Sequence, residues 1–91
     1  MADPLKGLTI GFLGAGTMGQ ALIRGLARAG VPRHRLAAAD VDRRTHAAVR
    51  RAGARVVSAA QLAREAAVIV LAVKPQQMAD ALADLAPSLR R

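Results

Sequence analysis

The chain has 91 residues, of which 53% are hydrophobic and 22% are charged. This composition predicts one small globular domain and excludes both a disordered chain and a complete two-domain enzyme. The sequence contains no cysteine, which excludes disulfides and thiolate metal sites. Its single aromatic residue, Phe12, is too little for the stacking platforms of single-stranded nucleic-acid binders.

The charge is strongly basic. Fourteen Lys and Arg against six Asp and Glu give a net charge of +8, which suits polyanionic partners such as nucleic acid or phosphorylated ligands. Many positive charges lie between Arg33 and Arg55, and we expect solvated helix surfaces there rather than a nucleic-acid interface. The longest apolar run, Ala66 to Val73, is too short to cross a bilayer, and the start Met1–Pro4 is no signal peptide. We therefore expect a cytoplasmic protein without membrane or nucleic-acid partners.

Strands and helices are predicted to alternate along the chain. Short apolar segments bounded by glycine or turn residues indicate buried strands. Apolar residues at steps of three and four, with N-capping residues and terminal glycines or prolines, indicate helices. The predicted strands are Leu8–Leu13, Leu36–Asp40, Ala54–Val57 and Ala67–Val73. The predicted helices are Thr17–Ala29, Arg43–Ala52 after an Asp42 cap, a short helix through Glu65 that starts with an S-x-x-Q capping box at Ser58 and Gln61, and Pro75–Leu85.

This alternation predicts an α/β fold. Right-handed crossovers would give a doubly wound parallel sheet of four strands in the order 3-2-1-4. The fourth strand then lies at an edge, although Ala67–Val73 is a near-continuous aliphatic run of the kind found in strands buried on both faces. Because an apolar edge strand invites pairing with another strand, we expect residues 1–91 to be one domain of a longer protein.

A glycine motif lies between the first predicted strand and the first predicted helix. Residues Gly14–Gly19 read GAGTMG and match G-x-G-x-x-G in the context that gives this pattern its meaning. Gly14 would permit a tight turn, Gly16 would let a pyrophosphate approach the backbone, and Gly19 would let the helix pack closely on the sheet. The free amides and the dipole of the following helix would bind the phosphates. The alternative is that these glycines serve only a tight connection.

Asp40 ends the second predicted strand, about 20 residues after the glycine motif. An acidic residue there commonly accepts hydrogen bonds from an adenosine ribose and favours NAD, because a carboxylate repels a 2′-phosphate. Arg43 and Arg44 follow at once, and a guanidinium can bind a 2′-phosphate through two hydrogen bonds. The sequence therefore does not decide between NAD and NADP. The alternatives are that Asp40 is only a loop or capping residue and that the two arginines lie on a solvated helix face.

Lys74 and Pro75 directly follow the fourth predicted strand. Strands 1 and 4 flank the point where the strand order reverses, so Ala72–Pro75 should face the same crevice as Gly14–Met18. The alternative for Lys74 is an ordinary exposed loop lysine. The two histidines lack metal-ligand spacing, and no nucleophile–base pair suggests covalent catalysis.

Two blocks of the sequence carry a family resemblance. Ile10–Met18 reads IGFLGAGTM and continues as ALIRGL over Ala21–Leu26, and Leu71–Gln76 reads LAVKPQ. In their residues and their spacing these blocks resemble the N-terminus of pyrroline-5-carboxylate reductases. The resemblance runs over essentially all 91 residues and covers only the NAD(P)-binding domain of that family. The positions that depart from the family pattern are Thr17, Gly19, Ala59 and Ala67.

The resemblance implies a Rossmann-type domain of an enzyme that reduces the C=N bond of 1-pyrroline-5-carboxylate to give proline, with NADP or NAD as cofactor. It also implies a cytoplasmic homo-oligomer whose helical C-terminal domain, absent from residues 1–91, supplies the dimer interface and the substrate pocket. We therefore expect no catalytic residue in this chain and no reductase activity from it alone. The expected cofactor-binding residues are Leu13, Gly14, Ala15, Gly16, Thr17, Met18, Asp40, Arg43, Ala72, Val73, Lys74 and Pro75.

Other functions stay open. A β-hydroxyacid or 6-phosphogluconate-type dehydrogenase shares the glycine-rich start but generally lacks Lys-Pro directly after the fourth strand. A stand-alone dinucleotide-binding module would need no further domain. An arginine-rich duplex DNA binder would be recognised by binding that survives about 200 mM salt, since non-specific phosphate contacts weaken steeply with salt.

Overall fold

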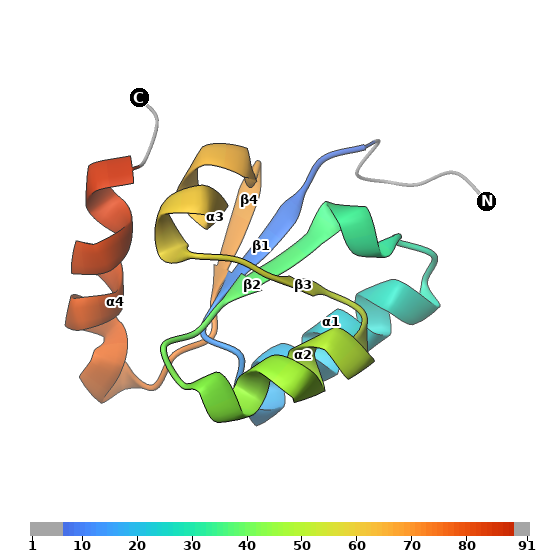
Figure 1. The fold of residues 1–91 in the computed structure, drawn as a ribbon, viewed down its shortest axis with the longest axis horizontal. Coiled ribbons are helices and arrows are strands. Elements are labelled where there is room, and N and C mark those ends of the chain that lie inside the picture. The colour runs from blue at the N-terminus through green and yellow to red at the C-terminus, as the bar shows by residue number, and fades with distance from the viewer. Residues whose placement is uncertain (1–6, 89–91) are drawn as a thin grey trace.

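The four strands form one parallel sheet. The computed structural model describes residues 7–88. β1 (Ile10–Leu13) lies between β2 (Leu36–Ala39) and β4 (Val68–Leu71), and β3 (Arg55–Val56) pairs with the other side of β2 (Figure 1). The observed order β3-β2-β1-β4 and the parallel pairing confirm the predicted fold class.

Helices cover both faces of this sheet. They are α1 (Thr17–Arg28), α2 (His46–Ala52), α3 (Ala59–Glu65) and α4 (Met78–Leu85). α1 and α2 lie on one face, and α3 and α4 lie on the other (Figure 1). The core beneath α1 and α2 contains Phe12, Ile23 and Val49, and the core beneath α3 and α4 contains Leu13 and Leu62. Successive residues of β1 thus point to opposite faces, and both are buried, as a doubly wound sheet requires. No helix within residues 7–88 is both long and apolar enough to cross a membrane.

Short 3-10 turns replace the predicted starts of two helices. Arg43–Thr45 forms such a turn before α2, and Pro75–Gln77 forms one before α4, although the sequence predicted helix from Arg43 and from Pro75. The Asp42 side chain caps the first turn, as predicted, and accepts a hydrogen bond from the Arg44 amide at 3.0 Å. Tighter 3-10 geometry is common at helix N-termini, and apolar periodicity does not distinguish it from α-helix.

β4 is the edge strand, as predicted. Its aliphatic sequence is typical of a strand buried on both faces, yet Val68 is 43% exposed and Leu71 is 42% exposed. The reason is topological: β4 pairs only with β1 among the described residues, so its outer side lacks a neighbouring strand and the covering that such a strand brings.

An ion pair joins α3 to β3, the edge strand opposite β4. Arg55 on β3 pairs with Glu65 at the end of α3 and also donates to the carbonyl oxygen of His34 at 3.0 Å. Gln61 donates to the other Glu65 oxygen at 3.1 Å. The predicted capping box at Ser58 is therefore half formed: Ser58 Oγ accepts from the Gln61 amide at 3.1 Å, while the Gln61 side chain binds Glu65.

We expect Glu65→Gln to make unfolding less sensitive to acid. The hydrogen bond from Arg55 lowers the pKa of Glu65 below its ordinary value of 4.5, so the folded state favours the carboxylate. This stabilisation is present above 4.5 and is lost as the pH falls through the lowered pKa. In circular-dichroism melts from about pH 6 to about pH 3, the melting temperature of the wild type should fall toward that of the variant. A constant difference across this range would contradict the assignment.

Candidate dinucleotide-binding site

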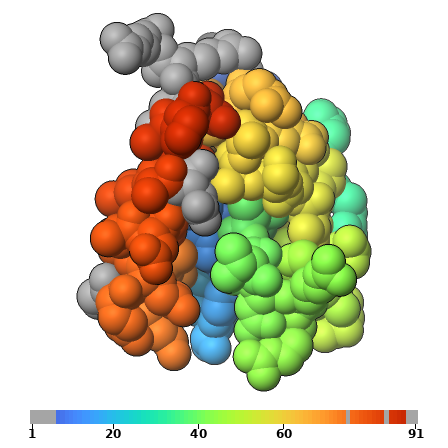
Figure 2. Space-filling model, turned by 60° about the vertical axis from the view of Figure 1, so that its left-hand side comes forward, coloured from blue at the N-terminus to red at the C-terminus, as the bar shows by residue number. Residues whose placement is uncertain are grey.

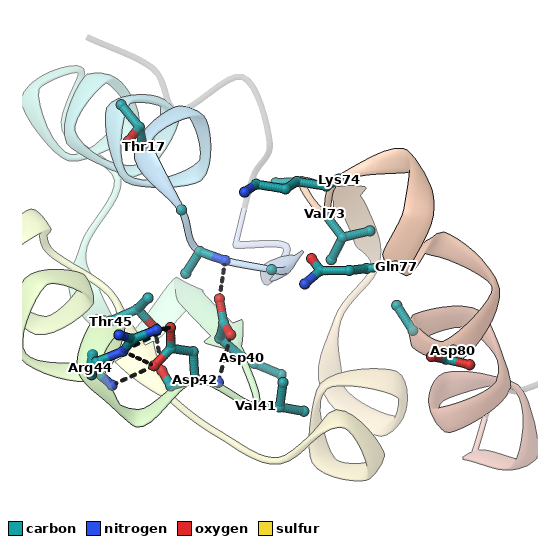
Figure 3. Close-up of a pocket in the computed structure, with 16 residues that line it drawn as sticks. Thr17, Asp40, Val41, Asp42, Arg44, Thr45, Val73, Lys74, Gln77 and Asp80 are labelled. Atoms are coloured by element: carbon teal, nitrogen blue, oxygen red, sulfur yellow. Dashed lines mark hydrogen bonds and ion pairs between the residues drawn. The ribbon is translucent and has the colours of Figure 1, made fainter.

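A cavity of about 600 Å³ opens at the carboxyl ends of β1, β2 and β4. This is the point where the chain leaves β1 for β2 on one side and later returns to β4 on the other, which is where open α/β sheets bind ligands. In Figure 2 the hollow lies between α4, in orange, and the green segment that follows β2, with blue residues of the β1 end at its floor. The residues that line it are Gly14–Thr17, Ala39–Asp42, Arg44, Thr45, Ala72–Lys74, Gln77, Asp80 and Ala81 (Figure 3).

The turn after β1 is held tightly against its neighbours. Gly14 has a φ of +91°, and its amide donates to the carbonyl oxygen of Ala39 at 2.8 Å. A Cβ on Gly14 would lie 2.5 Å from Val73 Cγ1 and 2.8 Å from the Ala72 carbonyl oxygen. A Cβ on Gly19 would lie 3.1 Å from the Gly14 oxygen. Packing of the protein itself therefore explains Gly14 and Gly19.

Gly16 is different, because the fold does not need a glycine there. A Cβ at this position would meet nothing within 4 Å, and the backbone φ of −73° is open to any residue. Gly16 is also the N-cap of α1 and has no side chain that could occupy the amides of the first turn. It lines the cavity, so a ligand at this point could approach the helix N-terminus directly.

Asp40 lies in the cavity with both carboxylate oxygens engaged by backbone amides. Oδ2 accepts from Ala15 N at 2.7 Å and Oδ1 accepts from Asp42 N at 2.8 Å (Figure 3). The carbonyl oxygen of Asp40 accepts from Nε2 of His46 at 3.0 Å. The predicted site residue is thus in the expected place, but its polar atoms already join the turn after β1 to the segment after β2.

The arginine that lines the cavity is Arg44, whereas Arg43, the predicted one, does not. The Arg44 side chain is 90% exposed and grips Asp42 with two parallel bonds, Nε to Oδ1 and Nη2 to Oδ2, both 3.0 Å long. These bonds lower the pKa of Asp42 below its ordinary value and raise the pKa of Arg44. A guanidinium held in this way is already oriented at the rim of the cavity.

The segment after β4 closes the opposite wall. The amide of Ala72 donates to the carbonyl oxygen of Leu13 at 2.8 Å, which continues the contact between β1 and β4. The exposed side chain of Lys74 extends toward the glycine turn (Figure 3). Lys74 is thus one of the cations on the cavity wall and can attract an anion at the start of α1.

Most of the predicted cofactor-binding residues come together in this cavity. Leu13 is instead buried in β1, and Met18 is 72% exposed on α1; neither lines the cavity. The side chain of Pro75 lies outside the described part of the structure. Among the lining residues that were not predicted are Gln77 and Asp80, and their spacing of one helical turn after Lys74 is the only signal in the sequence that could have indicated them. Within residues 7–88, no group of three or more His, Asp and Glu could hold a metal ion.

A parallel sheet of order 3-2-1-4, with a glycine turn and a helix N-terminus at its switch point, defines a Rossmann-type domain. The comparison with protein families is more specific. Residues 9–91 match the family described as NADP oxidoreductase, coenzyme F420-dependent, and the chain belongs to this family.

Comparison with individual proteins confirms the resemblance to pyrroline-5-carboxylate reductases. The chain is 35% identical over 91 residues to such a reductase from Glycine max, which covers 97% of this chain and 33% of the relative. It is 41% identical over 83 residues to one from Pseudomonas aeruginosa, covering 89% and 30%. The crystal structure of Plasmodium falciparum pyrroline carboxylate reductase with NADP bound superimposes with a TM-score of 0.73 and 28% identity, over 90% of this chain and 30% of that one. The chain thus spans about a third of the length of these relatives.

Proposed function

We propose that this chain is the cofactor-binding part of a pyrroline-5-carboxylate reductase and that its cavity binds NADPH or NADH. The observation that carries this proposal is Gly16, a glycine at a helix N-terminus that the packing of the protein does not require. Similarity to named reductases and to an NADP-bound structure supports it. On the same resemblance, the whole protein would be a cytoplasmic homo-oligomer that acts on 1-pyrroline-5-carboxylate.

Each wall of the cavity would have its own part in binding. The amides at the start of α1, from Gly16 to Met18, would bind the pyrophosphate together with the helix dipole. The segment after β2, with Asp40 and Arg44, would lie beside the adenosine ribose, and Ala72–Pro75 would line the ribose–nicotinamide side. When bound, the cofactor supplies the hydride for the imine carbon; the protein residues bind and orient it.

Parallel titrations with NADH and NADPH test the cofactor assignment. Isothermal calorimetry on the purified chain should show one site for at least one of the two, and heat from neither would contradict the proposal. The reductase assignment needs a second readout. A chimera in which residues 1–91 of this chain replace the matching residues of the Pseudomonas aeruginosa reductase should reduce 1-pyrroline-5-carboxylate. A folded chimera that binds NADPH without turnover would count against it.

Replacing Arg44 should change the choice between the two cofactors. Arg44 lines the cavity and holds its guanidinium exposed at the rim, where it can form charge-assisted bonds to a 2′-phosphate. We expect Arg44→Ala to weaken NADPH binding about tenfold and NADH binding far less. Arg43→Ala is the matched control, because this neighbouring arginine does not line the cavity. Equal losses for both cofactors, or a larger effect at Arg43, would contradict the assignment.

A further inference from the structure

Asp40 directly follows β2, and backbone amides already bind both of its carboxylate oxygens. We propose that Asp40 is a positioning residue, which holds the turn after β1 in the shape that binds a pyrophosphate, and that it does not act by accepting hydrogen bonds from ribose hydroxyls. This inference rests on the proposed function, since it assigns a role within the same nucleotide site.

The hydrogen bonds of the turn after β1 support this role. Asp40 Oδ2 accepts from Ala15 N at 2.7 Å, Gly14 N donates to the Ala39 carbonyl oxygen at 2.8 Å, and Gln20 Nε2 donates to the Ala15 carbonyl oxygen at 2.8 Å. The amides of residues 14 and 15 are therefore both directed at the end of β2 and are not available to a phosphate. With these two fixed, the amides left for a phosphate are the next ones, at the start of α1, where Gly16 and Thr17 line the cavity.

The other carboxylate oxygen of Asp40 is also occupied. Asp40 Oδ1 accepts from Asp42 N at 2.8 Å, so one carboxylate links the turn after β1 to the segment that carries Arg44. The side chain is half-buried, and Figure 3 shows its carboxylate aimed at the glycine turn. A ribose hydroxyl would have to share an oxygen that already accepts from a backbone amide, either that of Ala15 or that of Asp42.

The charge of Asp40 provides a way to distinguish the two roles. A carboxylate repels a pyrophosphate bound beside it, so Asp40 would weaken phosphate binding if it did no more than line the cavity. Removing a carboxylate that merely lines the cavity should strengthen anion binding. Replacing one that holds the turn by Asn should weaken it, because Asn has a single acceptor oxygen and cannot accept from both the Ala15 and the Asp42 amide, so the turn loses its fixed shape. The sign of the change therefore separates the two roles.

The experiment combines a change in the protein with a change in the ligand. Wild type and Asp40→Asn are titrated with ADP and with 2′,3′-dideoxy-ADP, which lacks the ribose hydroxyls. We expect the variant to bind both ligands about tenfold more weakly and by the same factor, so that the effects of the two changes are independent. The charge control is Asp80→Asn, which removes a carboxylate from the same cavity and should tighten binding of both ligands.

Two outcomes would overturn the inference. If removing the hydroxyls weakens binding to the wild type but not to Asp40→Asn, then Asp40 binds the ribose. If Asp40→Asn binds ADP as tightly as the wild type, or more tightly, then its bonds to the turn do not matter for phosphate binding. Failure of the proposed function looks different, because the wild type would then bind neither NADH, NADPH nor ADP.

A measurement without ligand keeps the positioning role testable in every case. The Ala15 and Asp42 amides should exchange with solvent slowly in the wild type, and at least one of them should exchange faster in Asp40→Asn, while amides of β1 keep their protection and the melting temperature falls by only about 5 °C. Asp40→Ser, whose short side chain has a single acceptor, serves as the second variant if Asp40→Asn does not fold. Unchanged exchange at both amides in a folded variant would refute the role.

Discussion

Gly16→Val should abolish binding of NADH and NADPH while the domain stays folded. The valine side chain has room within the protein, since a Cβ there meets no heavy atom within 4 Å and the φ of −73° is ordinary. It would stand at the N-terminus of α1, where a pyrophosphate must come close to the first amides. We expect calorimetry to show affinities at least about a hundredfold weaker and the melting temperature to fall by only about 5 °C, the cost of a poorer N-cap.

A second glycine of the same helix provides the control. Gly25 is exposed, and an added Cβ there also meets nothing within 4 Å, but Gly25 does not line the cavity. Gly25→Val should therefore bind both cofactors like the wild type. Undiminished affinity in Gly16→Val would remove the main support for the nucleotide site.

The second large effect is on stability: Gly14→Ala should destabilise the domain by about 3 kcal/mol or more. Two costs add at this position. The φ of +91° is unfavourable for alanine, and its Cβ would lie 2.5 Å from Val73 Cγ1 and 2.8 Å from the Ala72 carbonyl oxygen. The valine can turn away, but the backbone of Ala72 is held by its bond to Leu13 at 2.8 Å. Urea unfolding followed by circular dichroism measures the loss.

Gly30→Ala separates the two costs. Gly30 has a φ of +105°, yet an added Cβ meets nothing within 4 Å. This control should lose only about 1 kcal/mol, which is the conformational part alone. If Gly14→Ala and Gly30→Ala lose the same free energy, then the close approach between the turn after β1 and the segment after β4 contributes nothing. The wall of the cavity would then be looser than the structure indicates.

The fold could be predicted because each of its signals is local. Apolar runs of strand length and helical periodicity fixed the alternation of elements, and the handedness of crossovers then fixed the strand order. The position of the site followed from the same reasoning, because Gly14–Thr17 and Ala72–Lys74 follow neighbouring strands of the sheet. Two segments nearly 60 residues apart in the sequence were thus correctly predicted to share one cavity.

Details that depend on the start of a single turn could not be predicted. Adjacent residues of a 3-10 turn point in directions about 120° apart, so the turn at Arg43–Thr45 decides that Arg44 rather than Arg43 faces the cavity. Nor does the sequence show that Asp40 bonds to amides on two different segments, since those bonds span 25 residues in one case and two in the other. Whether a carboxylate is free for a ligand is a question of three-dimensional contacts.

The arrangement of strands around the cavity has a consequence for how the domain opens. β1 is paired on both sides, whereas within residues 7–88 β4, like β3 at the other edge, is paired on one side only, so the β4 side offers an easier route to partial unfolding than the centre of the sheet. The cavity is formed by the ends of β2, β1 and β4, and a ligand seated there would touch all three. Occupancy would therefore fasten the edge strand β4 to the central strands β1 and β2, and the free energy of binding would add to the resistance of that side against unfolding and proteolysis.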